Sequence, residues 1–248
     1  MPIGKLDYPA ERLAPFGREK ILMEANTDLE VAFRLKACAK EPWTVVMIEE
    51  LQPGEVLYDV GANVGSYTLL AAARGVQVVA FEPHFASFAA LVRNLALNDL
   101  LSRVIPLQVA LLSGPGLLWL HLNDLRAGTA GHAMSSDPKK QGFHKQAVPI
   151  FPLDSLQAQL GLPLPTAIKI DVDGAEGDVL AGAENLLAQP SLRVLMVELR
   201  LDVEQAGCAW LAERGWLMTA RFDERGGKKI GNICYGRFHR VASLETAG

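Results

Sequence analysis

Residues 56–65 read VLYDVGANVG, a short apolar run that passes through Asp59 into a turn with glycine at positions 61 and 65. The run has the length and composition of a buried strand, and the apolar spacing that follows it is typical of a helix. Glycine in a strand-to-helix turn lets the backbone approach a ligand, and the helix N-terminus offers unpaired N–H groups. The stretch therefore predicts a ligand site bordered by Asp59, Gly61, Ala62, Asn63, Val64 and Gly65.

Short apolar runs alternate with helical stretches from residue 55 onward, which is the pattern of βαβ units around a parallel sheet. We expect strands at 56–60, 76–81, 104–109, 117–122, 148–151, 167–172, 193–199, 216–221 and 232–238. We expect helices over 66–73, 85–95, 154–160, 177–188 and 203–214. The last two strands can be antiparallel, because a short turn joins them. Residues 55–248 are predicted to form this α/β domain, and residues 1–54 a helical extension or lid with a helix from Asp28.

The composition excludes several classes of protein. The chain has 248 residues, of which 50% are hydrophobic and 21% charged, so it is predicted to be globular rather than disordered, collagen-like or coiled-coil. Its net charge of −4 disfavours a nucleic-acid partner.

The cysteines and the apolar runs indicate the cellular compartment in which the protein is expected. Cys38, Cys208 and Cys234 form no CxxC pair, which suggests a reducing environment. The N-terminus lacks the apolar segment of a signal peptide, and no apolar run approaches the ~20 residues of a membrane span. We therefore expect a soluble, cytoplasmic protein of unknown oligomeric state.

Glu82 and Pro83 end the second predicted strand, and Glu82 follows Asp59 by 23 residues. An acid at that position can accept hydrogen bonds from both hydroxyls of a ribose. Acids at Asp59 and Glu82 together favour a ligand with an amine and a ribose, as in S-adenosyl-L-methionine. A nicotinamide-dependent oxidoreductase is disfavoured, because Asn63 and Ser66 stand where the dinucleotide fingerprint requires glycine. A non-catalytic nucleoside-binding module is a further alternative, and Asn63 also fits a left-handed turn residue.

Residues 168–176 read IKIDVDGAE and give the second set of candidates. Asp171 lies at the carboxyl end of a predicted strand, where open α/β sheets bind ligands, so it can contact the cofactor or act in catalysis. Asp173 and Glu176 either contact the acceptor or stabilise the start of the next helix. Lys169 points away from its apolar neighbours and is expected to be structural or solvated.

Glu198 ends the next predicted strand and is expected beside Asp171. The two carboxylates could take a proton from a hydroxyl or hold Mg²⁺, or Glu198 could pair with Arg193 or Arg200. His132 and His144, in a long polar loop over residues 123–146, are second candidates for substrate contact or for the base, and could equally be solvated.

The motifs together resemble the FkbM-type methyltransferases. The resemblance covers about residues 55–200 and rests on residues 59–65, Phe81-Glu82-Pro83, Asn94 and Asn98, residues 168–176, Val179-Leu180 and Gly182-Ala183. It implies a seven-stranded, three-layer, Rossmann-like sheet that uses S-adenosyl-L-methionine. It further implies that Asp59, Gly61, Asn63 and Gly65 border the methionine moiety and that Glu82 holds the ribose. Family members usually have Glu where this chain has Asp173.

The resemblance also implies O-methylation of a hydroxyl on a sugar, glycoconjugate or polyketide-like small molecule. The sulfonium of the cofactor makes its methyl group electrophilic, so the protein chiefly has to align an acceptor oxygen and exclude water. Small-molecule or glycan acceptors are thus the expected partners.

Overall fold

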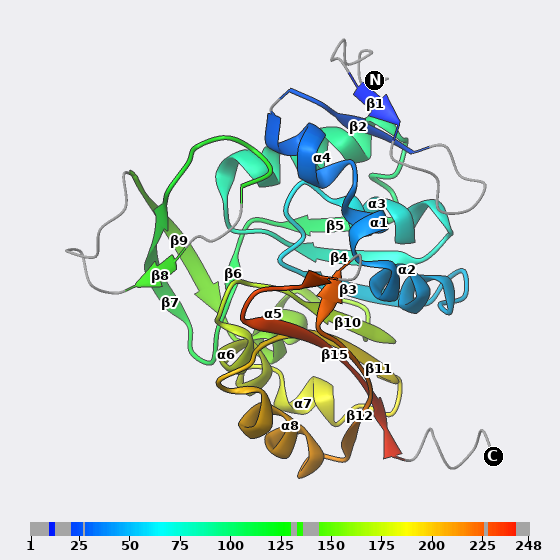
Figure 1. Cartoon of the computed structure of the whole chain (residues 1–248), viewed down its shortest axis with the longest axis vertical. Helices are drawn as coiled ribbons and strands as arrows, with labels where there is room; N and C mark the ends of the chain where they lie inside the picture. The colour runs from blue at the N-terminus through cyan, green and yellow to red at the C-terminus, as the bar shows by residue number, and fades with distance from the viewer. Residues whose placement is uncertain are drawn as a thin grey trace.

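The computed structural model describes residues 10–12, 21–26, 28–129, 133–135, 144–225 and 228–241. Its centre is a seven-stranded sheet in the order β12-β15-β11-β10-β3-β4-β5 (Figure 1). In that order the strands are Trp216–Phe222, Ile233–Arg240, Val194–Arg200, Ala167–Ile170, Val56–Val60, Gln77–Phe81 and Val104–Leu107. Only the two pairings of β15 are antiparallel. The predicted α/β sheet, mostly parallel with an antiparallel C-terminal strand, is confirmed.

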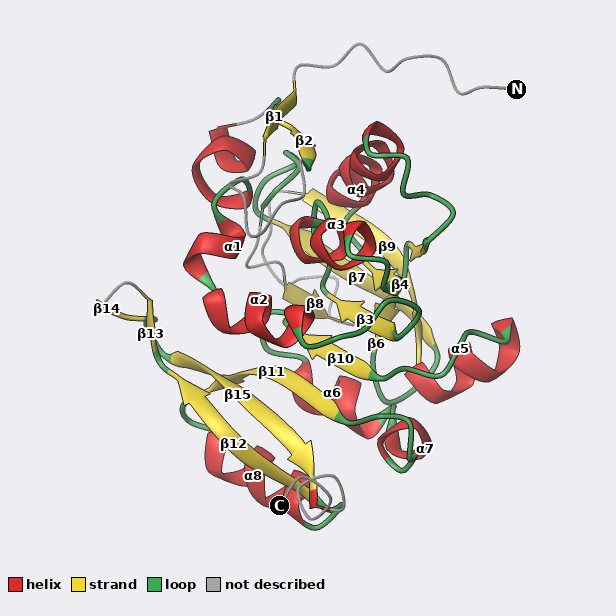
Figure 2. Cartoon of the chain, turned by 90° about the vertical axis from the view of Figure 1, so that its right-hand side faces the viewer, coloured by secondary structure: helices red, strands yellow, loops and turns green. Residues whose placement is uncertain are grey.

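Helices cover both faces of this sheet and give three layers (Figure 2). One face, here called the α3 face, packs against α1 (Ala37–Lys40), α2 (Pro42–Glu49), α3 (Ser66–Ala73) and α4 (Phe85–Leu97). The other, the α6 face, packs against α5 (Leu153–Leu160), α6 (Glu176–Ala181), α7 (Glu184–Leu187) and α8 (Glu204–Ala212). Because side chains alternate along a strand, each strand contributes to both cores.

The single helix predicted over residues 177–188 is wrong, because the chain forms α6 and α7 with a break at Gly182. The Gly182 carbonyl accepts a hydrogen bond from the Asp154 amide at 2.9 Å. The Asp154 carboxylate in turn accepts from the amides of Asn185 and Leu186 at 2.7 and 2.9 Å. A side chain at position 182 would meet the Leu112 carbonyl, so this break packs closely on its neighbours.

The N-terminal segment comprises β1 (Ala10–Arg12), β2 (Leu22–Glu24), helical turns from Asp28 that include the π-helix η1 (Glu30–Arg34), and then α1 and α2. Side-chain amides of α4 hold β2 in place. Asn98 bonds both the N–H and the carbonyl of Leu22, at 2.8 and 2.7 Å. Asn94 accepts from the Glu24 amide at 2.7 Å and donates to the Val64 carbonyl at 2.8 Å. Asn94 thus joins the N-terminal segment to the glycine turn.

A second, four-stranded sheet in the order β6-β9-β7-β8 projects from the body (Figure 1). Its strands are Ala110–Leu111, His144–Phe151, Gly116–Leu122 and Ala133–Ser135. The sequence predicted β7 and the end of β9 but no second sheet, and it assigned residues 123–146 to a loop. The beginning of β9 is polar and mostly exposed, so it carries no apolar alternation that could have indicated a strand.

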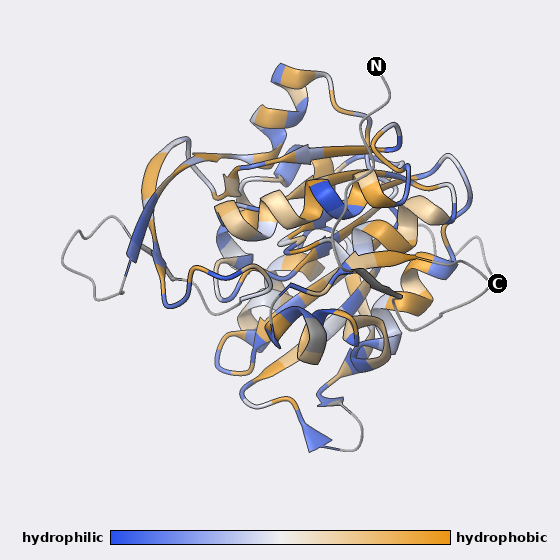
Figure 3. Cartoon of the chain, turned by 90° about the horizontal axis from the view of Figure 1, so that it is seen from above, coloured by the Kyte–Doolittle hydropathy of each residue, from blue (hydrophilic) through white to orange (hydrophobic). Residues whose placement is uncertain are grey.

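Hydrophobic residues fill the central strands and helices (Figure 3). A short hairpin of β13 (Glu224–Arg225) and β14 (Lys228–Lys229) lies outside the main sheet. Within the described ranges, no helix has the length and apolarity needed to cross a bilayer.

Candidate functional site

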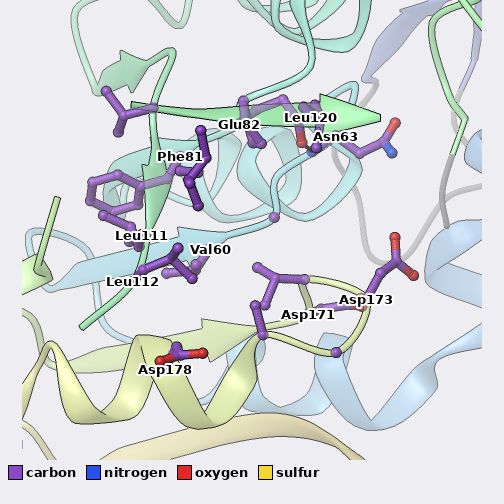
Figure 4. A pocket seen from close by; sticks show the side chains of 18 of the residues that line it. Val60, Asn63, Phe81, Glu82, Leu111, Leu112, Leu120, Asp171, Asp173 and Asp178 are labelled. Atoms are coloured by element: carbon purple, nitrogen blue, oxygen red, sulfur yellow. Dashed lines mark hydrogen bonds between the residues drawn. The ribbon is translucent and has the colours of Figure 1, made fainter. Parts of the chain in front are cut away.

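A cavity of about 540 Å³ lies at the carboxyl ends of β3, β4 and β10, and is called the first cavity. Figure 4 shows Asn63 and Glu82 on one side of it and Asp171 and Asp173 on the other. Its wall also includes Gly61 and Pro83, together with an apolar part formed by Val109, Leu111, Leu118 and Leu120. The cavity thus combines apolar surface with a few convergent polar groups, as small-molecule sites do.

The glycine turn packs directly on the end of β10. Gly61 has φ +81°, and a side chain there would stand 1.8 Å from the Asp171 carbonyl oxygen. Gly65, with φ +93°, precedes the first residue of α3. Of the predicted turn residues, Gly61 and Asn63 line the first cavity, whereas Ala62 and Val64 are buried beneath the turn. Glycine at position 61 is therefore required by close packing as well as by backbone conformation.

Asn63 occupies the left-handed region with φ +52°, as one of the two interpretations expected. It also has partners that a simple turn residue does not need. Its side-chain amide donates to the Thr129 carbonyl at 2.7 Å, and its backbone N–H donates to Glu82 at 2.8 Å. Asn63 therefore connects the turn, the strand β4 and the loop after β7.

Glu82 is buried at the end of β4, with both carboxylate oxygens directed at backbone amides. Oε2 accepts from Asn63 and Oε1 accepts from His84, each at 2.8 Å. Burial raises the pKa of Glu82 to about 7, although these two N–H groups act in the opposite direction. Each oxygen keeps a second acceptor position, so the carboxylate can also receive ligand hydroxyls.

Asp59 does not line the first cavity; it is fully buried on the α3 face. Its Oδ2 accepts from the Thr68 hydroxyl at 2.6 Å, and its Oδ1 lies 3.5 Å from Nζ of Lys169. Lys169 Nζ also lies 3.4 Å from Asp171 Oδ2. Asp59 therefore reaches the cavity indirectly, through a buried lysine that contacts the cavity-lining Asp171.

Lys169 is only 2% exposed, so the expectation of a solvated side chain is wrong. Burial alone lowers the pKa of Lys169, but the Asp171 and Asp59 carboxylates outweigh this effect and the net pKa lies above the ordinary value. The ammonium group stays charged between its two partners.

Glu198 lies next to Asp171 in the sheet order, as predicted, but it is hydrogen-bonded to a tyrosine. The Tyr235 hydroxyl donates to Glu198 Oε2 at 2.9 Å and lies 3.5 Å from Oε1 of Glu41. Glu41 also accepts from the Tyr67 hydroxyl at 2.7 Å. Burial raises the pKa of Glu198 to about 9, and the nearby Asp171 adds to the shift. Glu198 is consequently a neutral acid near pH 7, which disfavours it as a base.

The expected alternative pairing of Glu198 with an arginine does not occur. Arg200 pairs with Asp202, and Arg193 pairs with Glu55. In the part of the chain that the structure describes, no group of three or more His, Cys, Asp or Glu residues could hold a metal ion. The Lys169 ammonium lies beside Asp171 where a bound cation would have to compete with it.

Asp173 and Glu176 have different surroundings. Asp173 is exposed, has φ +57° and lines the first cavity. Glu176 is buried and turns back toward β10, where its Oε1 accepts from the amides of Gly174 and Val172 at 2.9 and 3.2 Å. Glu176 therefore holds the turn that presents Asp171 and Asp173.

Of the two histidine candidates, only His144 lies within the described residues. His144 is exposed at the start of β9 and does not line the first cavity. His132 lies outside the described residues.

Glu41, Tyr67 and Tyr235 were not among the predicted site residues. All three are buried and belong to the same polar cluster as the Lys169 ammonium. Nζ of Lys169 lies 5.3 Å from the centroid of the Tyr67 ring. A lysine in the middle of an otherwise apolar strand was the one signal that a buried polar cluster exists.

Comparisons with known proteins identify the family of the chain. The profile described as the methyltransferase FkbM domain matches residues 59–221. The chain is 31% identical to the 31-O-demethyl-FK506 methyltransferase FkbM of Streptomyces tacrolimicus over 230 residues, which covers 80% of this chain and 84% of the relative. It is 28% identical to the hexuronic acid methyltransferase AglP of Haloferax volcanii over 174 residues, which covers 70% and 68% respectively.

Among solved structures, a precorrin-6y C5,15-methyltransferase from Geobacter metallireducens aligns with a TM-score of 0.46 and 15% identity. The alignment covers 79% of this chain and 86% of that one.

Proposed function

The chain belongs to the family defined by the methyltransferase FkbM domain, and on this premise we propose that it transfers a methyl group from S-adenosylmethionine to an oxygen atom of a small-molecule or glycan acceptor. Family membership favours methyl transfer over a nicotinamide-dependent oxidoreductase and over a non-catalytic nucleoside-binding module. The observation that carries the proposal is the convergence of Glu82 and Asp171 on one cavity at the carboxyl ends of β4 and β10, the two strands that flank β3.

The residues of the first cavity fit S-adenosylmethionine. Its volume of about 540 Å³ lies within the range of small-molecule sites. Glu82 would accept the ribose hydroxyls, and the apolar wall that includes Leu111 and Leu118 would receive the adenine ring. The close approach of Gly61 to β10 leaves the turn backbone free to border the methionine moiety.

S-adenosylmethionine supplies an electrophilic methyl group when it is bound. Asp171 is placed to take the proton of an acceptor hydroxyl as the new carbon–oxygen bond forms and the carbon–sulfur bond breaks. Lys169 positions the Asp171 carboxylate from behind, and Asp59 positions Lys169. Asp173 lies on the same rim of the cavity and is the second acidic group within reach of an acceptor.

The names of the relatives support an oxygen-rich acceptor. One relative is named for a hexuronic acid and the other for a demethylated FK506. We keep hydroxyl-bearing sugars and polyketide-like molecules as the proposed acceptor classes, and the cytoplasm as the proposed location. The three cysteines are unpaired, which fits a reducing compartment.

Calorimetry with S-adenosylhomocysteine and with NAD tests the cofactor proposal. We expect S-adenosylhomocysteine to bind and NAD to show no heat above dilution, and binding of NAD alone would reverse the assignment. A panel of uronic acids and macrolides, followed by release of S-adenosylhomocysteine, then separates an enzyme from a binding module.

Asp171→Asn tests the proposed base. The variant should lose turnover by about 100-fold or more, because proton transfer is removed. Its affinity for S-adenosylhomocysteine should change by less than about threefold, since the charge-neutral amide keeps the shape of the site. Equal loss of turnover and affinity would instead make Asp171 a cofactor contact.

A further inference from the structure

The second, four-stranded sheet and the loop after β7 contact the chain on both sides of Glu82. The described part of this loop comprises residues 123–129, and its last three residues are buried. Gln146 in β9 reaches the start of α4, where its side chain bonds the backbone of two residues that follow Glu82. Both sets of contacts therefore join the second sheet to the end of β4, where the proposed ribose site lies.

The side-chain amide of Gln146 fixes the turn between β4 and α4. Its Nε2 donates to the Pro83 carbonyl at 2.7 Å, and its Oε1 accepts from the Phe85 amide at 3.1 Å. Phe85 is the first residue of α4, so its N–H has no acceptor within the helix. His84 lies between these two bonds, and its own amide donates to Glu82 Oε1 at 2.8 Å. A residue of the second sheet thus holds the direction of one of the two N–H groups that orient the carboxylate.

The loop after β7 acts on the other oxygen of Glu82. The Asn63 side chain donates to the Thr129 carbonyl at 2.7 Å, and the Asn63 backbone N–H donates to Glu82 Oε2. Thr129 lines the first cavity and also a second cavity of about 530 Å³. Packing leaves Thr129 unsupported toward both cavities, so hydrogen bonds are needed to hold it in place.

Ser87 joins the same loop to the start of α4. Its Oγ accepts from the Gly128 amide at 3.3 Å and lies at hydrogen-bond distance, 3.1 Å, from Nδ1 of His84. Arg34 holds Gly128 from the other side, because its Nε donates to the Gly128 carbonyl at 2.8 Å. Ser87 and His84 are both buried, so bulk water does not compete for these bonds.

The groups around Glu82 also favour its ionised form. Burial raises the pKa of Glu82 to about 7, and the His84 and Asn63 amides and the Arg34 charge act in the opposite direction. Displacement of either amide would favour the protonated carboxyl, which donates through one oxygen and accepts fewer hydroxyls. The placement of the two N–H groups therefore affects both the orientation and the charge of the carboxylate.

We infer that Gln146 and Ser87 are positioning residues of the cofactor site, which hold Glu82 in the orientation that receives both hydroxyls of a ribose. Neither residue lines the first cavity, so each acts through Glu82 rather than on the ligand. A carboxylate that accepts two neighbouring hydroxyls has to keep its plane fixed, because hydrogen bonds weaken steeply as their angles depart from linearity. The inference rests on the proposed function and extends the cofactor site to the second sheet.

Calorimetry on the full chain with S-adenosylhomocysteine and its 2′,3′-dideoxy analogue tests the inference. The ligands differ only in the two ribose hydroxyls, so the ratio of their dissociation constants measures what these hydroxyls contribute. We expect wild-type protein to bind the analogue about thirtyfold more weakly. In Gln146→Ala and in Ser87→Ala this ratio should fall by about fivefold or more, because only S-adenosylhomocysteine loses affinity.

Gln157→Ala is the matched control. Gln157 also donates its side-chain amide to a backbone carbonyl, that of Leu162 at 2.8 Å, and it lines neither cavity. We expect this variant to leave both dissociation constants unchanged. If Gln146→Ala and Ser87→Ala weaken both ligands equally, or neither of them, the two residues have a structural role alone and the inference is overturned.

Amide hydrogen exchange followed by NMR tests the same coupling in the wild-type protein. Because coupling between two sites is reciprocal, a ligand that uses the oriented carboxylate has to stabilise the contacts that orient it. We expect S-adenosylhomocysteine to slow exchange of the Phe85 amide, which donates to Gln146, more than the dideoxy analogue does. Equal exchange in the two complexes would contradict the inference.

These measurements separate the inference from the proposed function. Wild-type protein that binds neither ligand would overturn the proposed function, on which the inference rests. Equal affinity for the two ligands would show that Glu82 does not hold the ribose and would overturn the inference. Tight binding of S-adenosylhomocysteine with an unchanged ratio in both variants would overturn the inference alone.

Discussion

The two faces of the central sheet are built from the same strands but differ in chemistry. On the α6 face, β3, β10 and β11 contribute Val56, Tyr58, Val60, Ile168, Ile170, Leu195 and Val197 to a continuous apolar core. On the α3 face the same strands contribute Asp59, Lys169 and Glu198 between apolar neighbours, and β15 adds Tyr235. Because alternate residues of a strand point to opposite faces, the charged residues of these strands lie on the α3 face and their apolar neighbours in sequence lie on the α6 face.

Both faces carry an apolar core, and the α3 face differs in also holding buried charged groups. Apolar contacts on the α6 face stabilise the sheet without specific partners. Charged groups on the α3 face are costly to bury and need exact partners, so their presence beside a cavity indicates a functional site. We therefore expect substitutions on the two faces to differ in their effects on the free energy of unfolding and on ligand affinity.

Lys169→Met should produce the largest effect. It leaves Asp59 fully buried with only the Thr68 hydroxyl as a partner, which is expected to lower the free energy of unfolding by about 3–5 kcal/mol. Urea unfolding followed by circular dichroism measures the loss. The double variant Lys169→Met/Asp59→Asn should recover most of it, because it removes the unpaired charge. A loss below about 1 kcal/mol would show that the pair does not matter.

Leu195→Ala on the α6 face should produce a smaller and purely structural effect. Leu195 is fully buried, and the cavity left by truncation is expected to lower the free energy of unfolding by about 2–5 kcal/mol. Affinity of the folded variant for S-adenosylhomocysteine should stay within about twofold, because Leu195 does not line the first cavity. Calorimetry below the unfolding temperature measures this, and a large loss of affinity would mean that the faces are not independent.

Glu198→Gln should produce the smallest effect in acid and change the pH dependence of stability. Because the pKa of Glu198 is raised to about 9, the folded chain keeps a proton that the unfolded chain loses near its ordinary pKa. Stability from this group is therefore fully present in acid and is lost as pH rises toward 9. Between pH 6 and 8 the variant should lose less stability than the wild type, by on the order of 1 kcal/mol for each pH unit. Parallel unfolding curves for both proteins would contradict the assignment.

The sequence was sufficient to predict the sheet and the position of the first cavity. Glycines at 61 and 65 and acids at 82 and 171 mark the carboxyl ends of three strands, and such ends meet at one edge of a parallel sheet. These signals are local, so they can be recognised in the sequence without knowledge of the tertiary contacts.

Partners from distant segments could not be predicted in the same way. Lys169 was expected to be structural or solvated, and the sequence could not decide between the two, because alternation shows that it points away from Ile168 but not that Asp59 and Asp171 flank it. Glu41, Tyr67 and Tyr235 come from three elements that meet only in the folded chain. The break at Gly182 likewise depends on Asp154, which belongs to another helix.

Asn94 has a consequence for the order in which the molecule can be assembled. Its one amide group bonds both Glu24 in β2 and Val64 in the glycine turn. Residues 21–26 precede α4 in the chain. The Asn94 side chain that bonds them belongs to α4, some seventy residues later. The contact that holds β2 and the contact that supports the glycine turn therefore depend on the same side chain.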